Sequence, residues 1–373
     1  MLREDVHNST HGKNVPRCPA PYVSDRVLTK TLSGCIHLAR NPDLGGTEQQ
    51  IAVKTVWEIP GRIDLQDVEA EALLHHAVRH PHITKFIAYG TDRANRTRFL
   101  ATEYMAGGDL FDFTNKLPGK QLSPGLAWAF FGQLVSAVQY LHSLGIVHLD
   151  LCLENVLVSE DGHSIKLCDF GLARRQQQQF STRGFPTSVL RQENNSGSIG
   201  EQCITVKREA MNYVVGRPGY MAPEMYHLPT SSPTQLSCDL VKPGAVDGYR
   251  RSPALPAFSY LVESPAELVA DDGMDLPVNG AALDVFALGV ILFVLLTNTP
   301  PWERPDVKRD KRFQWITAKR RLPELLRHWS LPQLSEPVVD LLHRMWSIDP
   351  EARPTASEIA QIHSSIPTVL LEK

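Results

Sequence analysis

Two short loops that carry acidic and amide side chains most constrain what this chain can fold into. The first, at residues 148–155, contains Asp150 and Asn155 between a helical pattern and an apolar run. The second, Asp169 followed by Phe170 and Gly171, begins fourteen residues beyond Asn155. A carboxylate can accept a proton from a hydroxyl group, and carboxylate and carboxamide oxygens are ligands for hard metal ions. The two loops therefore predict a site that combines a metal ion with proton transfer.

Length and composition restrict the class of protein. A chain of 373 residues suits two lobes with insertions, and the formal charge of -3 argues against nucleic acid as the main partner. The six cysteines form no C-x-x-C pair, which indicates reduced thiols, so we expect a cytoplasmic protein, with the nucleus as a second location. The longest apolar run, residues 285–296, is too short to span a bilayer and predicts a buried helix without membrane insertion.

The first hundred residues predict strands around one helix. Alternating apolar residues indicate strands at 22–32, 35–40, 51–56, 83–89 and 98–103, and residues 64–78 favour a helix. Lys54 lies inside an apolar strand and needs a buried partner, for which the helix offers Glu69 and Glu71. Four histidines, at 75, 76, 80 and 82, suggest a metal site. A solvated helix end before a His-Pro turn is the favoured interpretation, because no Cys or carboxylate cluster completes a ligand set.

The second half predicts mostly helices. Ser123-Pro124 is a typical helix start, and apolar residues at helical spacing follow it as far as residue 141. Further helices are expected at 285–296, led by Asp284, from Glu336 onward, and after the capping box that begins at Thr355. Polar stretches at about 175–205 and 228–278 read as loop insertions.

Taken in order, these motifs resemble those of eukaryotic protein kinases of the Ser/Thr type. They are Lys54 in its strand, the His148-Leu149-Asp150 loop ending at Asn155, Asp169-Phe170-Gly171, and Ala222-Pro223-Glu224. The ending Leu153-Glu154-Asn155 is loosely similar to the calmodulin-dependent and AMP-activated kinase group. The resemblance implies an α+β bilobal kinase-like fold, with an antiparallel N-lobe sheet plus one helix and a mainly helical C-lobe.

The resemblance also implies a domain division. Residues 1–21 are expected to be a disordered tail, 22–363 the kinase domain and 364–373 a C-terminal tail. Within the domain, the N-lobe covers 22–103, the hinge about 103–108 and the C-lobe 109–363, which includes both insertions. Arg353 is expected to pair with Glu224.

By the same resemblance, the site residues have separate roles. Lys54, held by Glu71 at the family's spacing from Pro81, would clamp the phosphates of ATP, and Asp150 would take the proton of the substrate hydroxyl. Asn155 and Asp169 would hold Mg²⁺, or Mn²⁺, and Thr102 would be the gatekeeper beside the adenine. The residues expected around the nucleotide are Leu28, Gly34, Ile36, Ala52, Lys54, Thr102, Glu103, Met105, Asp109, Leu157 and Asp169.

The sequence departs from the family pattern at five positions. Thr29 and Thr31 stand where two glycines of the phosphate loop are usual, and Leu149 replaces the Arg before the catalytic Asp. Cys152 replaces a Lys that helps to neutralise the transferring phosphoryl group, and Arg217 replaces a Thr that contacts this Lys. We hypothesise that Arg217 supplies the missing positive charge as part of the catalytic set. The alternative is an Arg that faces solvent.

The resemblance implies transfer of the γ-phosphate of ATP to Ser/Thr hydroxyls of protein substrates. The alternative is a pseudokinase scaffold that binds nucleotide and protein partners with little turnover. Glu154 and Asp109 suggest basic residues beside the target hydroxyl, and Leu149 suggests that phosphorylation is not the main switch. Cys152 and Cys168 are expected to be inert thiols, with inhibition by oxidation as the alternative. The sequence predicts no oligomeric state.

Overall fold

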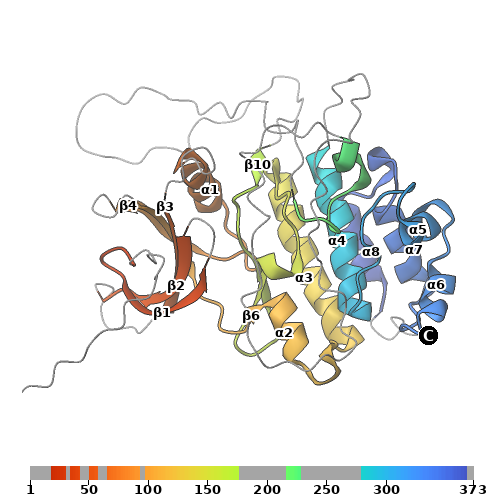
Figure 1. Ribbon diagram of the computed structural model, residues 1–373, viewed down its shortest axis with the longest axis horizontal. Helices are drawn as coiled ribbons and strands as arrows, with labels where there is room; N and C mark the ends of the chain where they lie inside the picture. The colour runs from red at the N-terminus through yellow and green to blue at the C-terminus, as the bar shows by residue number, and fades with distance from the viewer. Residues whose placement is uncertain are drawn as a thin grey trace, which may run out of the picture.

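A five-stranded antiparallel sheet with one helix forms the first lobe of the computed structural model, which describes residues 18–30, 34–42, 50–57, 65–92, 97–175, 216–227 and 279–367. The strand order is β1-β2-β3-β5-β4. Figure 1 shows the sheet and α1 together on one side of the molecule, beside a larger helical lobe. The elements are β1 (Val23–Lys30), β2 (Gly34–Arg40), β3 (Gln50–Trp57), α1 (Leu65–Ala77), β4 (Phe86–Asp92) and β5 (Thr97–Glu103).

The second lobe is mainly helical, with two small sheets on the side that faces the first lobe (Figure 1). Its strands are β6 (Gly108–Asp109), β7 (Ile146–Val147), β8 (Val156–Val158), β9 (Ile165–Leu167) and β10 (Arg174–Arg175). Its helices are α2 (Leu110–Lys116), α3 (Pro124–Ser143), α4 (Gly280–Thr297), α5 (Lys311–Phe313), α6 (Leu322–His328), α7 (Glu336–Met345) and α8 (Ala356–Ser365). This architecture confirms the α+β bilobal fold class.

Two helix starts follow their local sequence signals. The Ser123 side chain accepts a hydrogen bond from the Leu126 N–H, and Pro124 occupies the first turn of α3. Thr355 and Glu358 bond each other's backbone N–H groups, which forms the expected capping box of α8. Both starts were predicted correctly because capping chemistry is local.

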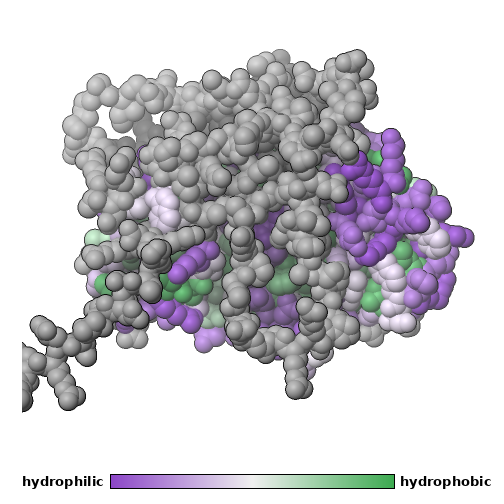
Figure 2. All heavy atoms as spheres, in the orientation of Figure 1, coloured by the Kyte–Doolittle hydropathy of each residue, from purple (hydrophilic) through white to green (hydrophobic). Residues whose placement is uncertain are grey.

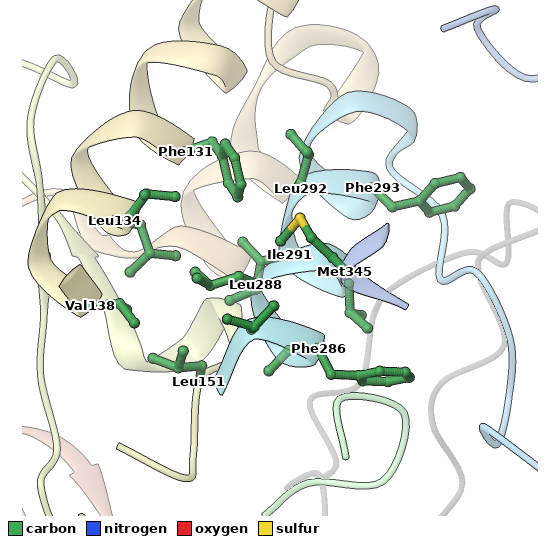
Figure 3. Close-up of a cluster of buried hydrophobic side chains, with 14 of the residues drawn as sticks. Phe131, Leu134, Val138, Leu151, Phe286, Leu288, Ile291, Leu292, Phe293 and Met345 are labelled. Atoms are coloured by element: carbon green, nitrogen blue, oxygen red, sulfur yellow. The ribbon is translucent and has the colours of Figure 1, made fainter. Parts of the chain in front are cut away.

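Helix α4 is the centre of the helical lobe. Figure 3 shows Phe131, Leu134 and Val138 of α3 pointing toward Leu288 and Ile291 of α4 in the buried core. The helix is apolar and long enough to cross a membrane by composition, yet 89% of its 18 residues are buried within the protein. The expectation of a buried core helix is therefore confirmed.

The start of α4 differs from the prediction. Asp284 was expected to lead the helix, but the helix begins at Gly280 and Asn279 caps it by accepting from the Ala282 N–H. Asp284 instead lies in the second turn and is 1% exposed. The small residues of the first turn carry too weak an apolar signal to show the true boundary.

Other boundaries of strands and helices also differ from the prediction. Strand β4 begins at Phe86 rather than at Ile83, which forms an isolated bridge to Leu167 in β9. Cys18 belongs to the predicted tail of residues 1–21, yet it is partly buried against the core cluster that contains Tyr22 and Ile51. Helix α8 ends at Ser365, two residues beyond the expected domain end. Most of the predicted tails and nearly all of both insertions lie outside the described residues.

A bidentate ion pair joins the short helical turn at residues 223–227 to the helical core. The Nη1 and Nη2 atoms of Arg353 donate to Glu224 at 2.6 and 2.8 Å. Nη1 also donates to the carbonyl of Ala282 in α4, and the Arg353 side chain is fully buried. The pairing expected from the resemblance is confirmed, and it ties residues 223–227 to α4.

Candidate active site

A lysine, a glutamate and an aspartate from three elements meet between the lobes. Lys54 Nζ in β3 donates to both carboxylate oxygens of Glu71 in α1, at 2.9 and 3.0 Å, and to Asp169 Oδ1 at 3.3 Å. Burial alone would lower the pKa of Lys54, but the charges of Asp169 and Glu71 outweigh burial and raise it. Glu69, the alternative partner, instead lies 3.5 Å from Arg98. The structure thus selects Glu71.

Four of the predicted nucleotide residues share one face of the sheet. In the antiparallel ladders, Ile36 is opposite Lys54, and Ala52 is opposite Thr102. Directly opposed residues lie on the same face, and so do residues two apart in β3, such as Ala52 and Lys54. Since Lys54 points at Asp169, this face looks into the space between the lobes.

Gly34 has a packing role in addition to the expected role beside the nucleotide. A Cβ atom at this position would lie 1.7 Å from the carbonyl oxygen of Thr55 in β3. Only glycine allows β2 to approach β3 so closely. Leu28 and Thr29 lie in β1, where Leu28 is partly buried and Thr29 is exposed, and Thr31 lies outside the described residues.

The side chain of Glu103, in the predicted hinge, is occupied by hydrogen bonds within the protein. Its carboxylate accepts hydrogen bonds from Lys166 Nζ at 2.7 and 2.9 Å and from the Lys85 N–H. Any contribution of Glu103 to adenine binding is therefore confined to its backbone. The Met105 carbonyl accepts from the Gly108 N–H, which closes the hinge turn. Sequence reasoning missed Lys166, whose only signal was a polar residue inside the short apolar strand β9.

Asp109 and Leu157 are neighbours below the hinge. They are opposed in the β6–β8 ladder, so both side chains lie on the same face. The Asp109 carboxylate also caps α2 by accepting from the Asp112 N–H at 2.8 Å. This hydrogen bond fixes the carboxylate at the entrance of the second lobe.

Asn155 holds the proposed base, Asp150, in place. Its Nδ2 donates to the Asp150 carbonyl at 2.8 Å and to Asp150 Oδ2 at 2.7 Å. The other carboxylate oxygen, Oδ1, is buried and has no hydrogen-bond partner in the described part of the chain. Burial raises the pKa of Asp150 to about 7, against the opposing charge of Arg217. A base poised near neutrality with one open oxygen is suited to accept a hydroxyl proton.

Asp284 anchors the backbone of this loop. Its two carboxylate oxygens accept from the N–H groups of His148 and Leu149, both at 2.8 Å, and Oδ2 also lies 2.9 Å from His142 Nε2. Leu149 has a φ of 65°, which is strained for a residue with a branched side chain. The Asp284 bonds and the burial of Leu149 in the apolar core hold this strained conformation.

Replacing Asp284 by Ala should destabilise the fold and misplace the base. Two buried N–H groups would lose their acceptor, at a cost of about 1–3 kcal/mol each. We expect the urea midpoint of unfolding to fall by a corresponding amount. The control is Asp340→Ala, which removes an exposed carboxylate 3.3 Å from Arg320 and should cost less than about 1 kcal/mol. Equal losses in the two variants would contradict the anchoring role.

Asp169 and Asn155 offer oxygen ligands of the kind that a divalent metal ion takes. The charge of Lys54 lowers the pKa of Asp169 to about 2, so its carboxylate is ionised at neutral pH, and 43% of the side chain is exposed. Within the described residues, no group of three His, Cys, Asp or Glu side chains could hold a metal ion by itself. Mg²⁺ is usually held by one or two protein oxygens plus substrate phosphates, so a two-residue set suits it.

Arg217 lies over the base rather than in solvent. Its Nη1 is 3.0 Å from Glu154 Oε1 and its Nε is 3.8 Å from Asp150 Oδ1. Only 29% of the side chain is exposed. Gly216, with a φ of 100°, precedes it and would bring a Cβ within 3.1 Å of the Leu149 carbonyl. The alternative of a solvent-facing Arg is therefore wrong.

Burial or ring packing surrounds the cysteines and histidines near the site. Cys152 is fully buried, and burial raises the pKa of its thiol and of the Cys168 thiol, which favours inert thiols. The His75 ring stacks on Phe170 with 4.8 Å between centroids, and the His148 ring makes a T-shaped contact with Phe170 at 5.3 Å. The expectation of a solvated helix end is wrong for His75, which is 1% exposed because Phe170 covers it.

Comparison with known proteins gives this geometry a family. The model of the protein kinase domain matches residues 33–240 and 266–363. The chain belongs to the protein kinase family. The γ catalytic chain of human phosphorylase b kinase, liver/testis isoform, is 28% identical over 352 residues, which cover 91% of this chain and 64% of that protein.

Two other relatives are much longer than this kinase-family chain. A serine/threonine-protein kinase of Drosophila melanogaster is 27% identical over 78% of this chain and 28% of its own length. A probable serine/threonine protein kinase of Arabidopsis thaliana is 26% identical over 98% of this chain and 24% of its own length. The chain thus spans about a quarter of these relatives.

Proposed function

We propose that this chain transfers the γ-phosphate of ATP to Ser or Thr hydroxyls of protein substrates. The observation that carries the proposal is the convergence of Lys54, Asp150, Asn155 and Asp169 between the lobes. Phosphoryl transfer depends on positioning and on charge neutralisation more than on covalent chemistry, and these groups supply both. The relatives named as serine/threonine kinases support the same conclusion.

The proposed reaction assigns one task to each group. Lys54, fixed by Glu71, would contact the phosphates, and Asp169 and Asn155 would hold a magnesium ion that neutralises phosphate charge. The substrate oxygen forms a bond to the γ-phosphorus while the bond to the β-γ bridging oxygen breaks and leaves its electron pair on ADP. The hydroxyl proton passes to Oδ1 of Asp150. Oδ1 is the carboxylate oxygen of Asp150 that lacks a hydrogen-bond partner among the described residues.

Arg217 completes the proposed catalytic set. From a different loop, it would supply the positive charge that the family's lysine provides at the position of Cys152. Cys152 stands where the family has that lysine, and its neutral, buried thiol supplies no charge. The guanidinium of Arg217 is close enough for its charge to act on this thiol, and its Nε lies 3.8 Å from Asp150 Oδ1. A positive charge at this point favours the charge that develops on the transferring phosphoryl group. The pseudokinase alternative rested partly on the missing lysine, and this arrangement weakens it.

The proposed substrate carries a basic residue near the target hydroxyl. Glu154 Oε2 is buried and has no hydrogen-bond partner among the described residues, although Oε1 is paired with Arg217. A carboxylate oxygen beside the base that lacks a hydrogen-bond partner favours a cationic substrate side chain. Asp109 adds a second negative charge near Glu154. Burial raises the pKa of Asp109, and the charge of Glu154 raises it further. A cytoplasmic or nuclear location and use of Mn²⁺ in place of Mg²⁺ belong to the same proposal.

Activity should not depend on phosphorylation of the chain itself. Leu149 is apolar and buried, so the catalytic loop offers no guanidinium at this position to receive a phosphate. We expect protein treated with a general phosphatase to retain nearly full kcat on a peptide substrate. Mass spectrometry confirms removal of phosphate, and mock-treated protein is the control. A loss of tenfold or more would contradict this part of the proposal.

A further inference from the structure

A strongly basic segment lies at the far end of the helical lobe. Residues 303–328 include nine Lys and Arg but four Asp and Glu, a net charge of +5 in a chain whose formal charge is -3. The segment contains α5, a π-helical turn over Gln314–Ala318, and α6. We call it the basic segment. Its cations are Arg304, Lys308, Arg309, Lys311, Arg312, Lys319, Arg320, Arg321 and Arg327.

About half of this positive charge is not neutralised by neighbouring carboxylates. Four of the arginines are paired with acidic side chains at distances between 3.0 and 4.0 Å. Lys308, Lys311, Lys319 and Arg327 are all exposed, and no ion pair joins any of them to another described residue. Exposed cations at this density attract a partner of opposite charge.

An exposed tryptophan stands among these cations. Trp315 is 38% exposed, and the Lys319 Nζ and Arg321 Cζ atoms lie 5.5 and 5.4 Å from the centre of its ring. It occurs in the π-helical turn. Such turns are rare overall, but many of those that occur are at functional sites. Tryptophan and arginine are the residues that most often anchor protein interfaces. The basic segment therefore combines charge with an aromatic anchor.

The basic segment is separate from the catalytic site. In Figure 1, α5 and α6 lie at the end of the helical lobe opposite the sheet and α1, which carry Lys54 and Glu71. The same end of the molecule shows a broad hydrophilic surface in Figure 2. The charge is thus placed where a partner can bind without blocking the space between the lobes.

We propose that the basic segment is a docking surface for an acidic segment of a protein partner. Its cations are interrupted by four carboxylates, which suits side chains of a peptide better than the unbroken phosphate row of a nucleic acid. The net negative charge of the whole chain opposes binding to a broad anionic membrane. Trp315 gives an acidic peptide an apolar contact among the cations. The surface does not require that the chain be catalytically active.

The test uses the full chain and a fluorescein-labelled twelve-residue peptide of alternating Glu and Gly, followed by fluorescence anisotropy. The double variant Lys311→Glu/Lys319→Glu should bind the peptide about tenfold or more weakly, which corresponds to about 1.4 kcal/mol. The matched control, Lys116→Glu/Lys120→Glu, makes the same change of charge at exposed lysines near α2 and should bind within twofold of the unaltered chain. Trp315→Ala should weaken binding several-fold at constant charge. Raising the salt concentration should weaken binding as well.

Several outcomes would overturn the proposal. Equal weakening of peptide binding in the two double variants would show that binding depends only on the net charge of the chain. Preferential binding of a single-stranded oligonucleotide or of phosphatidylserine vesicles would assign the surface to another class of partner. Residues 263–275 carry five Asp and Glu and no Lys or Arg. Peptide binding that appears only after their deletion would make this stretch of the same chain the occupant. The kcat on a short peptide should stay unchanged in both double variants, and a fall in Lys311→Glu/Lys319→Glu alone would contradict the separation of docking from catalysis.

Discussion

Replacing Asp150 by Asn should reduce phosphoryl transfer by about 10²–10⁴-fold, the usual contribution of a positioned acid or base. The amide cannot take the hydroxyl proton. Because it has nearly the same size and keeps one oxygen, the hydrogen bond from Asn155 and the loop conformation should persist. The affinity for Mg²⁺-ATP should change by less than about threefold, because the lost group binds no phosphate. Turnover on a peptide and binding of a fluorescent ATP analogue measure the two quantities.

The control for this variant is Asp161→Asn. Asp161 is an exposed carboxylate in the turn between β8 and β9, where it accepts from the His163 N–H. The change alters one charge in the same lobe and should leave turnover nearly unaltered. Comparable losses in the two variants would mean that Asp150 acts through net charge or folding rather than as the base.

Replacing Arg217 by Thr should lower kcat by about 10²–10³-fold, the cost of removing one donor from a preorganised anion site. ATP affinity should be preserved, since the partners of Arg217 are Asp150 and Glu154, which bind no phosphate in the proposed reaction. A fall in kcat with an unchanged affinity is the signature of a group that acts in the transition state. Normal turnover of Arg217→Ala would contradict the role.

A second change should partly rescue this variant. Cys152 is buried beside Asp150 and Glu154, whose charges raise the pKa of its thiol in addition to burial. Cys152→Lys alone would place two cations in one space and should lower activity. Combined with Arg217→Thr, the new lysine gains both space and the two carboxylates, and kcat should rise by about tenfold over Arg217→Thr alone, or 1.4 kcal/mol. Additive losses would show that the positions are not coupled.

The sequence allowed most of the fold to be predicted because its motifs occur in a fixed order and its caps are local. Ser123 and Thr355 each mark a helix start with atoms a few residues away. The start of α4 escaped prediction because the position of Asp284 is set by the N–H groups of the catalytic loop, more than 130 residues earlier in the chain. Tertiary contacts of this kind leave no local pattern.

The site was predictable as a set of residues but not as a set of contacts. The Lys54–Glu71 pair followed from the family's spacing, whereas Arg217 required the structure to decide between solvent and the base. Lys166 and its bond to Glu103 had only a weak local signal. The basic segment was missed because the charge of the whole chain, -3, conceals a local charge of +5. A charge count in short windows would have found it.

The identity of the phosphorylated product tests the central claim most directly. The purified, phosphatase-treated chain is incubated with radiolabelled Mg²⁺-ATP and a peptide library rich in Ser, Thr and Tyr, and the phosphoamino acids are separated. The account predicts phosphoserine or phosphothreonine at a rate at least a hundredfold above that of Asp150→Asn, the lower end of the contribution of a general base. Label no higher than in Asp150→Asn, from a chain that still binds ATP, would contradict it and indicate a scaffold.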